Sequence, residues 1–243
     1  MRMIPFAKRC TKELLRDPLN LMFGLGFPVV LLLLLRAIQS NIPVDLFEIQ
    51  HLAPGIAVFG LSFMTLFSAT LVARDRETSF LQRLYTTPMK SVDFILGYLL
   101  PLLPIAMAQS AVSFLIAVLL GLPVTTNILS AVLMIVPISV FYIALGLLCG
   151  SIFNVKQVGG ICGALLTNLS AWLSGVWFDL DLVGGTFGKI ANVLPFIHAV
   201  DLERAMINGN FSAAVPHIYP VFGYSVIVLI GAVFVFLRQM KKQ

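Results

Sequence analysis

Uncharged apolar runs take up most of the chain. The long apolar stretches, each free of Asp, Glu, Lys and Arg, are residues 18–35, 49–73, 94–155, 157–178 and 217–237. Because a helix needs roughly 20 mostly apolar residues to cross a bilayer, each of the shorter runs predicts one span. The long run predicts two spans, which the turn-forming residues Gly121, Pro123 and Asn127 separate. The pattern therefore predicts six transmembrane helices.

Composition supports the same fold class. Hydrophobic residues make up 59% of the 243 residues, and charged residues make up 11%. An ordinary soluble domain is about a quarter charged, and a fold of this size in water could not bury so much apolar side chain. We therefore expect an all-α integral membrane protein, built as a single transmembrane domain over residues 1–243.

The distribution of basic residues predicts how the spans are oriented. Cytoplasmic segments of membrane proteins carry an excess of Lys and Arg. If the N-terminus is cytoplasmic, the outside receives only Arg36, Lys189 and Arg204 of the 16 Lys and Arg residues. An even number of spans then places both ends of the chain on the cytoplasmic side. We predict a multi-pass protein of the cytoplasmic membrane with both termini inside.

Residues 1–17 precede the first span and have an amphipathic pattern. Phe6, Cys10 and Leu14 share one face of a helical projection, whereas a second face holds Lys8, Lys12 and Arg16. Such a helix can lie along the inner leaflet with its lysines near anionic lipid. The alternative is a solvated basic tail, and we favour the interfacial helix.

The predicted cytoplasmic loop over residues 74–92 contains a second short amphipathic helix. Its apolar side chains recur at helical spacing and form one face: Phe80, Leu81, Leu84 and Tyr85. Pro88 ends this helix, because proline disfavours helical geometry in the residue before it. The helix suits docking against a soluble partner or resting on lipid headgroups, and composition alone leaves both alternatives open.

Residues 179–216 form the longest predicted external segment. An apolar patch from Ile190 to Ile197 is interrupted by Pro195 and is too short to cross the membrane. We expect a pair of short re-entrant helices in the outer leaflet, where irregular backbone must be covered by protein. An ordinary external loop with one hydrophobic patch is the alternative.

Small and polar residues within the spans are candidates for helix packing and for a translocation path. Gly159 and Gly163 form a small-xxx-small pair that allows close helix packing. The candidate path residues are uncharged and polar: Ser62, Thr65, Gln109, Asn168, Ser170 and Ser174. Such side chains can line a path, but most of them simply form hydrogen bonds between helices.

The sequence contains no recognisable catalytic, cofactor-binding or metal-binding constellation. It has no Gly-rich phosphate loop ending in Lys-Ser/Thr, no His-Glu metal motif and no nucleophile elbow. The three cysteines have no paired spacing. All charged residues lie outside the apolar runs, which argues against a proton-coupled carrier because such carriers use ionisable groups inside the membrane.

The order of these features resembles the permease subunit of type-2 ABC exporters, a family that includes polysaccharide, drug and lipid export permeases. The most specific stretch contains Arg76-Glu77, Thr78-Ser79, Leu81-Gln82-Arg83-Leu84, Thr87-Pro88 and Gly97. Two later stretches also match, Ser174-Gly175 with Trp177-Phe178, and Leu194-Pro195-Phe196 through Arg204 to Gly209. Gln82 stands where many members have Glu, and Thr78-Ser79 replaces the usual Gly-Thr.

The resemblance implies an ATP-driven exporter that moves an amphiphilic substrate, such as a drug, a peptide, a lipid or a lipid-linked molecule. The permease would pair with a second copy or a close relative, and separate ABC ATPase subunits would bind ATP-Mg and hydrolyse it. The residues that the resemblance assigns to ATPase coupling are Glu77, Phe80, Leu81, Arg83, Leu84 and Tyr85. A secondary carrier or channel acting without ATP is the alternative, and a membrane-embedded enzyme is a third. No nucleic-acid partner is expected.

Overall fold

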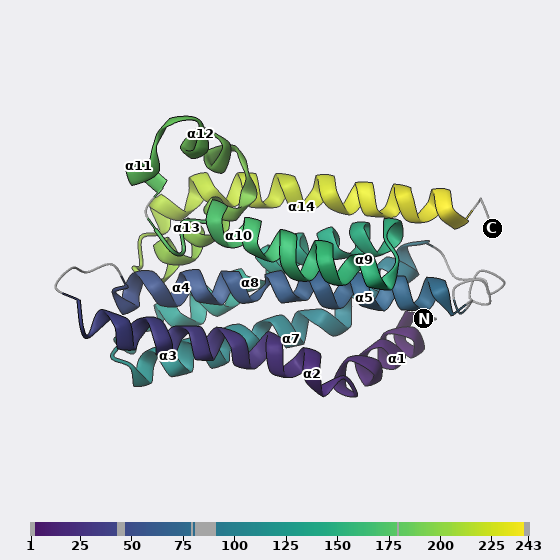
Figure 1. Cartoon of the computed structure of the whole chain (residues 1–243), viewed down its shortest axis with the longest axis horizontal. Helices are drawn as coiled ribbons and strands as arrows, with labels where there is room; N and C mark the ends of the chain where they lie inside the picture. The colour runs from purple at the N-terminus through teal and green to yellow at the C-terminus, as the bar shows by residue number, and fades with distance from the viewer. Residues whose placement is uncertain (1–2, 43–46, 79, 81–90, 179, 241–243) are drawn as a thin grey trace.

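The computed structural model describes residues 3–42, 47–78, 80, 91–178 and 180–240, and these residues form long helices that run side by side (Figure 1). The first half of the chain contains α1 (Met3–Leu15), α2 (Pro18–Leu21), η1 (Met22–Gly26), α3 (Phe27–Gln39), α4 (Ile49–Gly60), α5 (Ser62–Glu77) and α7 (Ser91–Leu119). The second half contains α8 (Asn127–Ile152), α9 (Val155–Val158), η2 (Gly159–Leu166), α10 (Thr167–Leu173), α11 (Leu180–Val183), α12 (Gly185–Val193), α13 (Pro195–Ile207) and α14 (Phe211–Met240). The elements η1 and η2 are π-helical.

The all-α membrane fold is confirmed. Among the described residues, five helical segments are long and apolar enough to cross a membrane: Pro18–Gln39, Ile49–Glu77, Val92–Leu119, Asn127–Ile152 and Phe211–Gln239. The predicted span over residues 157–178 corresponds to α9, η2 and α10, which follow one another without a break from residue 155 to residue 173. This segment is not among the five, so the count of six spans stays a prediction.

Both chain ends lie at the same end of the bundle. In Figure 1 the N-terminus, the C-terminus and α9 are at the right, whereas α11 and α12 are at the left. An even number of crossings brings the two termini to one side, as the distribution of basic residues predicts. The predicted turn between the third and fourth spans is also observed, because α7 ends at Leu119 and α8 begins at Asn127. Gly121 adopts a positive φ of 109° there, which glycine tolerates without steric cost.

The α4–α5 span lies at the centre of the bundle. In this span, 89% of the apolar stretch is buried within the protein, compared with 22% of the apolar stretch of Pro18–Gln39. α5 packs very closely against α8, and a Cβ atom at Gly146 of α8 would overlap the Ser68 side chain and the Thr65 carbonyl. Small residues at helix crossings allow such close approach in membranes. The central position of α5 makes it a contact partner of several other spans.

The predicted external segment contains the helices α11, α12 and α13, and its last residues already belong to α14, which begins at Phe211. α13 packs against α14, α8 and α4, and the ring of Phe196 lies 5.8 Å from that of Phe141. At the other end of α13, the Asn127 side chain donates a hydrogen bond to the Ile207 carbonyl. α13 is therefore an integral part of the helix bundle. Insertion of these short helices into the outer leaflet stays a prediction.

Candidate functional site

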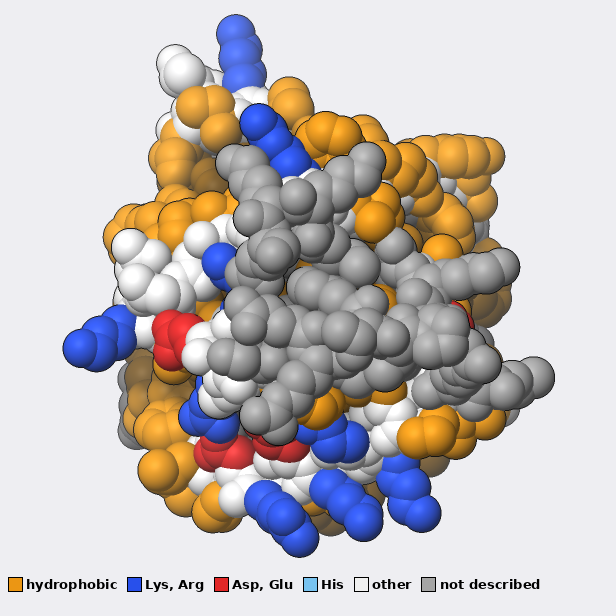
Figure 2. Space-filling view, turned by 90° about the vertical axis from the view of Figure 1, so that its right-hand side faces the viewer, with side chains coloured by type: hydrophobic (Ala, Val, Ile, Leu, Met, Phe, Trp, Pro, Cys, Tyr) orange, Lys and Arg blue, Asp and Glu red, His pale blue; other side chains and the backbone are white. Residues whose placement is uncertain are grey.

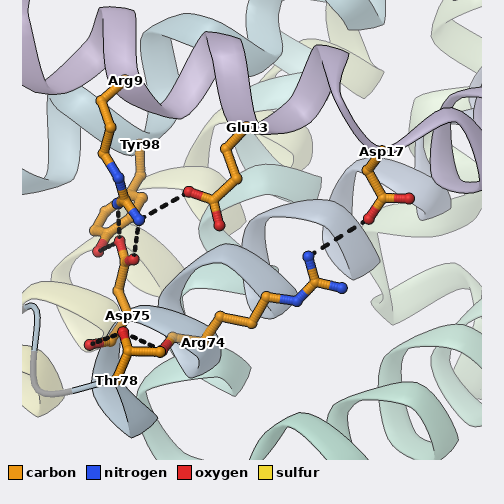
Figure 3. Close-up of polar contacts among 7 residues, drawn as sticks. All are labelled: Arg9, Glu13, Asp17, Arg74, Asp75, Thr78 and Tyr98. Atoms are coloured by element: carbon orange, nitrogen blue, oxygen red, sulfur yellow. Dashed lines mark hydrogen bonds and ion pairs between the residues drawn. The ribbon is translucent and has the colours of Figure 1, made fainter.

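The last turn of α5 carries four consecutive charged residues, and each of them contacts a different partner. Arg74, Asp75, Arg76 and Glu77 close the span. Figure 3 shows Arg9 and Glu13 of α1 approaching this turn together with Tyr98 of α7. We call the contacts made by these four residues the α5 end cluster. It lies at the end of the bundle that holds both termini (Figure 1).

Asp75 is the centre of the cluster and is 1% exposed. The Arg9 guanidinium donates two hydrogen bonds to its carboxylate, at 2.5 and 2.6 Å, and the Tyr98 hydroxyl donates a third at 2.8 Å. A buried carboxylate is strongly unfavourable unless it is paired and hydrogen-bonded. The bidentate geometry is the strongest arrangement for an Arg–carboxylate pair. This pair fixes α1 to the end of α5 and to α7.

Arg9 makes two further contacts. Glu13 of the next helical turn lies 2.8 Å from its guanidinium, and the guanidinium carbon lies 4.0 Å above the centre of the Phe80 ring. Burial by itself lowers the pKa of Arg9, but the hydrogen bond and charge of Asp75 outweigh it, so the pKa lies above its ordinary value. Arg9 therefore stays charged and links α1, α5 and Phe80.

Arg74 connects α5 to the start of the first span. Its guanidinium lies 3.5 Å from the Asp17 carboxylate. Asp17 is the N-cap of α2, because its side chain accepts a hydrogen bond from the Asn20 backbone N–H. Asp, Ser, Thr and Asn are the residues that satisfy the free N–H groups at helix starts. The same carboxylate thus starts the first span and contacts α5.

Arg76 and Glu77 connect α5 to the fourth and fifth predicted spans. Arg76 donates hydrogen bonds to the carbonyls of Gly150, at 2.8 Å, and Phe153, at 3.2 Å. These carbonyls belong to the C-terminal end of α8, where cations are favoured. The Glu77 carboxylate accepts a hydrogen bond of 3.0 Å from the Val155 N–H, the first residue of α9. The end of α5 therefore contacts the entry of both the first and the fifth predicted spans.

The predicted ATPase-coupling residues fall into two groups. Leu81, Arg83, Leu84 and Tyr85 lie outside the described residues. Glu77 bonds to α9, and the Phe80 ring lies 6.4 Å from the Phe6 ring of α1. Both described side chains contact their own chain, and a role in ATPase coupling stays a prediction for the whole set.

A groove of about 420 Å³ opens beside α5, between the first, second and fifth predicted spans. Its lining is mostly aromatic and aliphatic: Asn20, Phe23, Phe27, Leu31, Phe59, Phe63, Leu66, Gly163, Thr167, Asn168, Ala171 and Trp177. Both π-helical segments border it, and π-helical turns are frequent at functional sites. A Cβ at Gly24 of η1 would lie 2.6 Å from the Phe67 ring of α5. A Cβ at Gly163 of η2 would lie 3.5 Å from the Leu66 side chain of α5, so both walls of the groove contact α5.

Only one of the predicted path residues lines this groove. Asn168 faces it and donates a hydrogen bond to the Ala164 carbonyl within its own helix. The other five are buried. Thr65 donates to the Tyr142 carbonyl, and Ser170 forms a 2.9 Å hydrogen bond with the Tyr142 hydroxyl. These bonds join helices, so a role in the path stays a prediction for the buried residues.

The remaining path residues bond locally or have no partner among the described residues. Ser174 donates to the Ala171 carbonyl, and the Gln109 amide donates to Ser113 Oγ. Ser62 Oγ and Gln109 Oε1 are buried without a hydrogen-bond partner in the described part of the chain. Gln109 packs tightly on Gly60, where an added Cβ would overlap its amide.

The two predicted packing glycines have different surroundings. A Cβ at Gly163 would lie 3.5 Å from the Leu66 side chain of α5, an ordinary packing contact. A Cβ at Gly159 would have no atom within 4 Å among the described residues. Gly163 therefore lies at a helix contact within the chain. The described residues provide no neighbour for Gly159, and its packing role stays a prediction.

Comparison with known proteins identifies the family. A sequence model of the ABC-2 type transporter family matches residues 6–208. The chain belongs to the ABC-2 type transporter family. A search of curated proteins gave no significant match. The matched region contains both the α5 end cluster and the groove, so this ABC-2 permease carries them within its transmembrane transport domain.

Sequence reasoning missed the partners of the α5 end cluster. Asp75 lies at the end of an apolar span, and an acidic residue there needs a cation, but the sequence offers many basic residues. It also gave no sign that Glu203 is fully buried with both carboxyl oxygens lacking a partner among the described residues. Both carboxyl groups lie outside the uncharged runs, as expected, yet the fold buries them.

Proposed function

We propose that this ABC-2 permease is the transmembrane subunit of an ATP-driven exporter that moves an amphiphilic substrate across the cytoplasmic membrane. Separate ABC ATPase subunits bind and hydrolyse ATP-Mg at the end of the bundle that holds both termini, which is then the cytoplasmic end. The permease acts with a second copy of itself or a homologous permease. It has no ATPase site of its own.

The observation that carries this proposal is the set of contacts made by the last turn of α5. Asp75 binds α1, Arg74 contacts the N-cap of the first span, and Glu77 bonds to the start of α9. The first span continues into η1, and α9 continues into η2. A displacement of this turn therefore acts on both walls of the groove at once. Two sites are coupled when they contact an element with two conformations and each site binds its ligand more tightly in one of them. α5 with its attached helix ends suits that role.

The lining of the groove supports the proposed substrate class. Aromatic rings such as Phe27, Phe63 and Trp177 line the groove together with aliphatic side chains, and Asn20 and Asn168 supply amide groups. Ligand sites are typically apolar with a few polar groups that set orientation. A molecule with one apolar part and one polar part fits such a surface.

The exposed face of the fifth predicted span supports pairing with a second copy. Gly160, Ala164 and Asn168 follow one another at a spacing of four residues and are exposed in the single chain. Small residues at this spacing allow two membrane helices to pack closely, and an amide can bond across the contact. The groove lies against this span and would be covered by the second copy.

Affinity purification of the tagged chain from its own membrane tests the proposal. We expect an ABC ATPase subunit to copurify in fixed ratio, and we expect Leu84→Asp to remove it without loss of membrane insertion. Phe211→Asp is the matched control, because Phe211 is 54% exposed at the start of α14, at the opposite end of the bundle. The control variant should retain the ATPase.

The copurified complex should then move a fluorescent amphiphile outward across vesicle membranes only with hydrolysable ATP. A chain that purifies alone and transports without ATP would overturn the proposal in favour of a secondary carrier. An ATPase that stays bound to the Leu84→Asp variant would overturn the predicted docking segment.

A further inference from the structure

Two grooves meet at the same pair of lysines on α1. A polar groove of about 790 Å³ and an apolar groove of about 730 Å³ both include Lys8 and Lys12 in their lining. Both lysines are exposed. The pair thus separates a charged surface from an apolar one at the end of the bundle where the termini lie.

The apolar groove lies between α1, the first span and α7. Its lining contains no acidic side chain: Ile4, Ala7, Lys8, Thr11, Lys12, Leu15, Leu21, Leu25, Leu100, Pro101, Pro104, Ile105 and Ala108. Leu15 is 61% exposed and Ile4 is 55% exposed on α1, and Leu100 is 39% exposed on α7. The groove thus includes the two lysines on α1 and, on α7, apolar side chains as far as Ala108.

The carboxylates of the polar groove already have cationic partners. Glu13 pairs with Arg9, and Asp17 pairs with Arg74. No described carboxylate lies within ion-pair distance of Lys8 or Lys12. Figure 2 shows Lys and Arg side chains gathered along the lower edge of this end, where Figure 1 places α1. The lysines are therefore available to a negatively charged group from outside the chain.

We propose that this site binds one anionic phospholipid from the leaflet at the α1 end of the bundle. An acyl chain lies in the apolar groove, and the headgroup phosphate binds Lys8 and Lys12. Charge complementarity favours an anionic lipid over a zwitterionic one, and the apolar groove favours a lipid over a free phosphate. The lipid contacts both α1 and α7, so it adds to the Arg9–Asp75 contact in holding α1 on the bundle.

Native mass spectrometry of the purified chain tests this site without the ATPase, so its result is independent of the exporter proposal. Phosphatidylglycerol, phosphatidylcholine and glycerol 3-phosphate are added separately at equal concentration. We expect phosphatidylglycerol to bind in preference to both others. The double variant Lys8→Gln/Lys12→Gln should weaken the binding of phosphatidylglycerol roughly thirtyfold. Each lysine near a lipid surface contributes about fivefold to the affinity, and the two contributions multiply. Lys156→Gln is the matched control, because Lys156 is exposed on α9 at the same end of the bundle but lines neither groove.

A second pair of variants tests the apolar groove. Ala108 is exposed in the wall of this groove, so Ala108→Phe should fill the groove and weaken phosphatidylglycerol binding without a change of charge. Ala213→Phe, at an exposed position near the start of α14, should leave binding unchanged. Equal binding of phosphatidylcholine would overturn recognition of the headgroup, and equal binding of glycerol 3-phosphate would overturn the acyl-chain site. Wild-type binding by the double lysine variant or by Ala108→Phe would overturn the site itself.

Discussion

Replacing Arg9 with alanine should release α1 from the end of α5. In the Arg9→Ala variant the Asp75 carboxylate, 1% exposed, keeps the hydrogen bond from Tyr98 as its one side-chain contact among the described residues. Removing one partner of a buried ion pair costs about 3–5 kcal/mol, because the other charge is left uncompensated. Since 1.4 kcal/mol is a factor of ten in an equilibrium constant, the population with α1 undocked should rise by roughly 10² to several times 10³.

Asp75→Ala should have a smaller effect than Arg9→Ala. The Arg9 side chain is 34% exposed and keeps its contact with Glu13, so solvent and Glu13 compensate its charge. The main loss is a buried Tyr98 hydroxyl without its acceptor, which costs about 1–3 kcal/mol. The double variant Arg9→Ala/Asp75→Ala should be less undocked than Arg9→Ala alone, because it contains no uncompensated buried charge.

Cys10 provides the assay for α1 docking. Its side chain is fully buried on α1, and burial, with a further contribution from the charge of Asp75, raises its pKa to about 12. The thiolate is the reactive form of cysteine, so a docked Cys10 should react slowly with a maleimide at neutral pH. The labelling rate is measured in nanodiscs in a Cys149→Ala/Cys162→Ala background. Arg16→Ala is the control, because Arg16 is exposed and belongs to none of the ion pairs of the described residues.

Two outcomes would refute the reasoning on this ion pair. If Cys10 in the Arg9→Ala variant reacts no faster than in the Arg16→Ala control, the pair does not hold α1. If the effects of Arg9→Ala and Asp75→Ala add fully in the double variant, the two side chains are not energetically coupled.

Three further predictions address the groove, the buried carboxyl group and the topology. Gly24→Leu should destabilise the protein by about 1–3 kcal/mol through overpacking on Phe67. Gly26→Leu is the control and should not destabilise it, because a Cβ added at Gly26 meets its nearest atom at 3.9 Å. Equal melting temperatures of the two variants would contradict this prediction. Burial raises the pKa of Glu203. The stabilisation from its protonated carboxyl group is therefore complete below about pH 4.3, the pKa of Glu in the unfolded chain, and is lost as the pH rises. Glu203→Gln should match the wild type near pH 4 and melt at a higher temperature at pH 7, and a difference that does not vary with pH would rule out this explanation. Ser212→Cys should react with a membrane-impermeant thiol reagent added to intact cells, and the absence of labelling in a normally inserted variant would count against the proposed orientation.

The sequence by itself determined the features that depend on local pattern. The uncharged runs predicted the membrane character and the positions of five long apolar helices. They could do so because a helix in lipid must satisfy its own backbone hydrogen bonds and present apolar side chains over its whole length. The amphipathic pattern at the N-terminus gave α1 and its buried face of Phe6, Cys10 and Leu14. The motifs around Arg76-Glu77 also gave the family, which the match over residues 6–208 confirms.

Only the tertiary structure decided which side chains meet. Arg9 and Asp75 are 66 residues apart, and nothing in the local pattern selects Arg9 over the other basic residues near the N-terminus. Thr65 and Ser170 both bond to Tyr142 on α8 because the helices pack closely enough there. The groove requires three spans to lie side by side, with both π-helical segments resting on α5 or beside it. Helical periodicity determines the face on which a residue lies, but the packing of the helices determines what that face contacts.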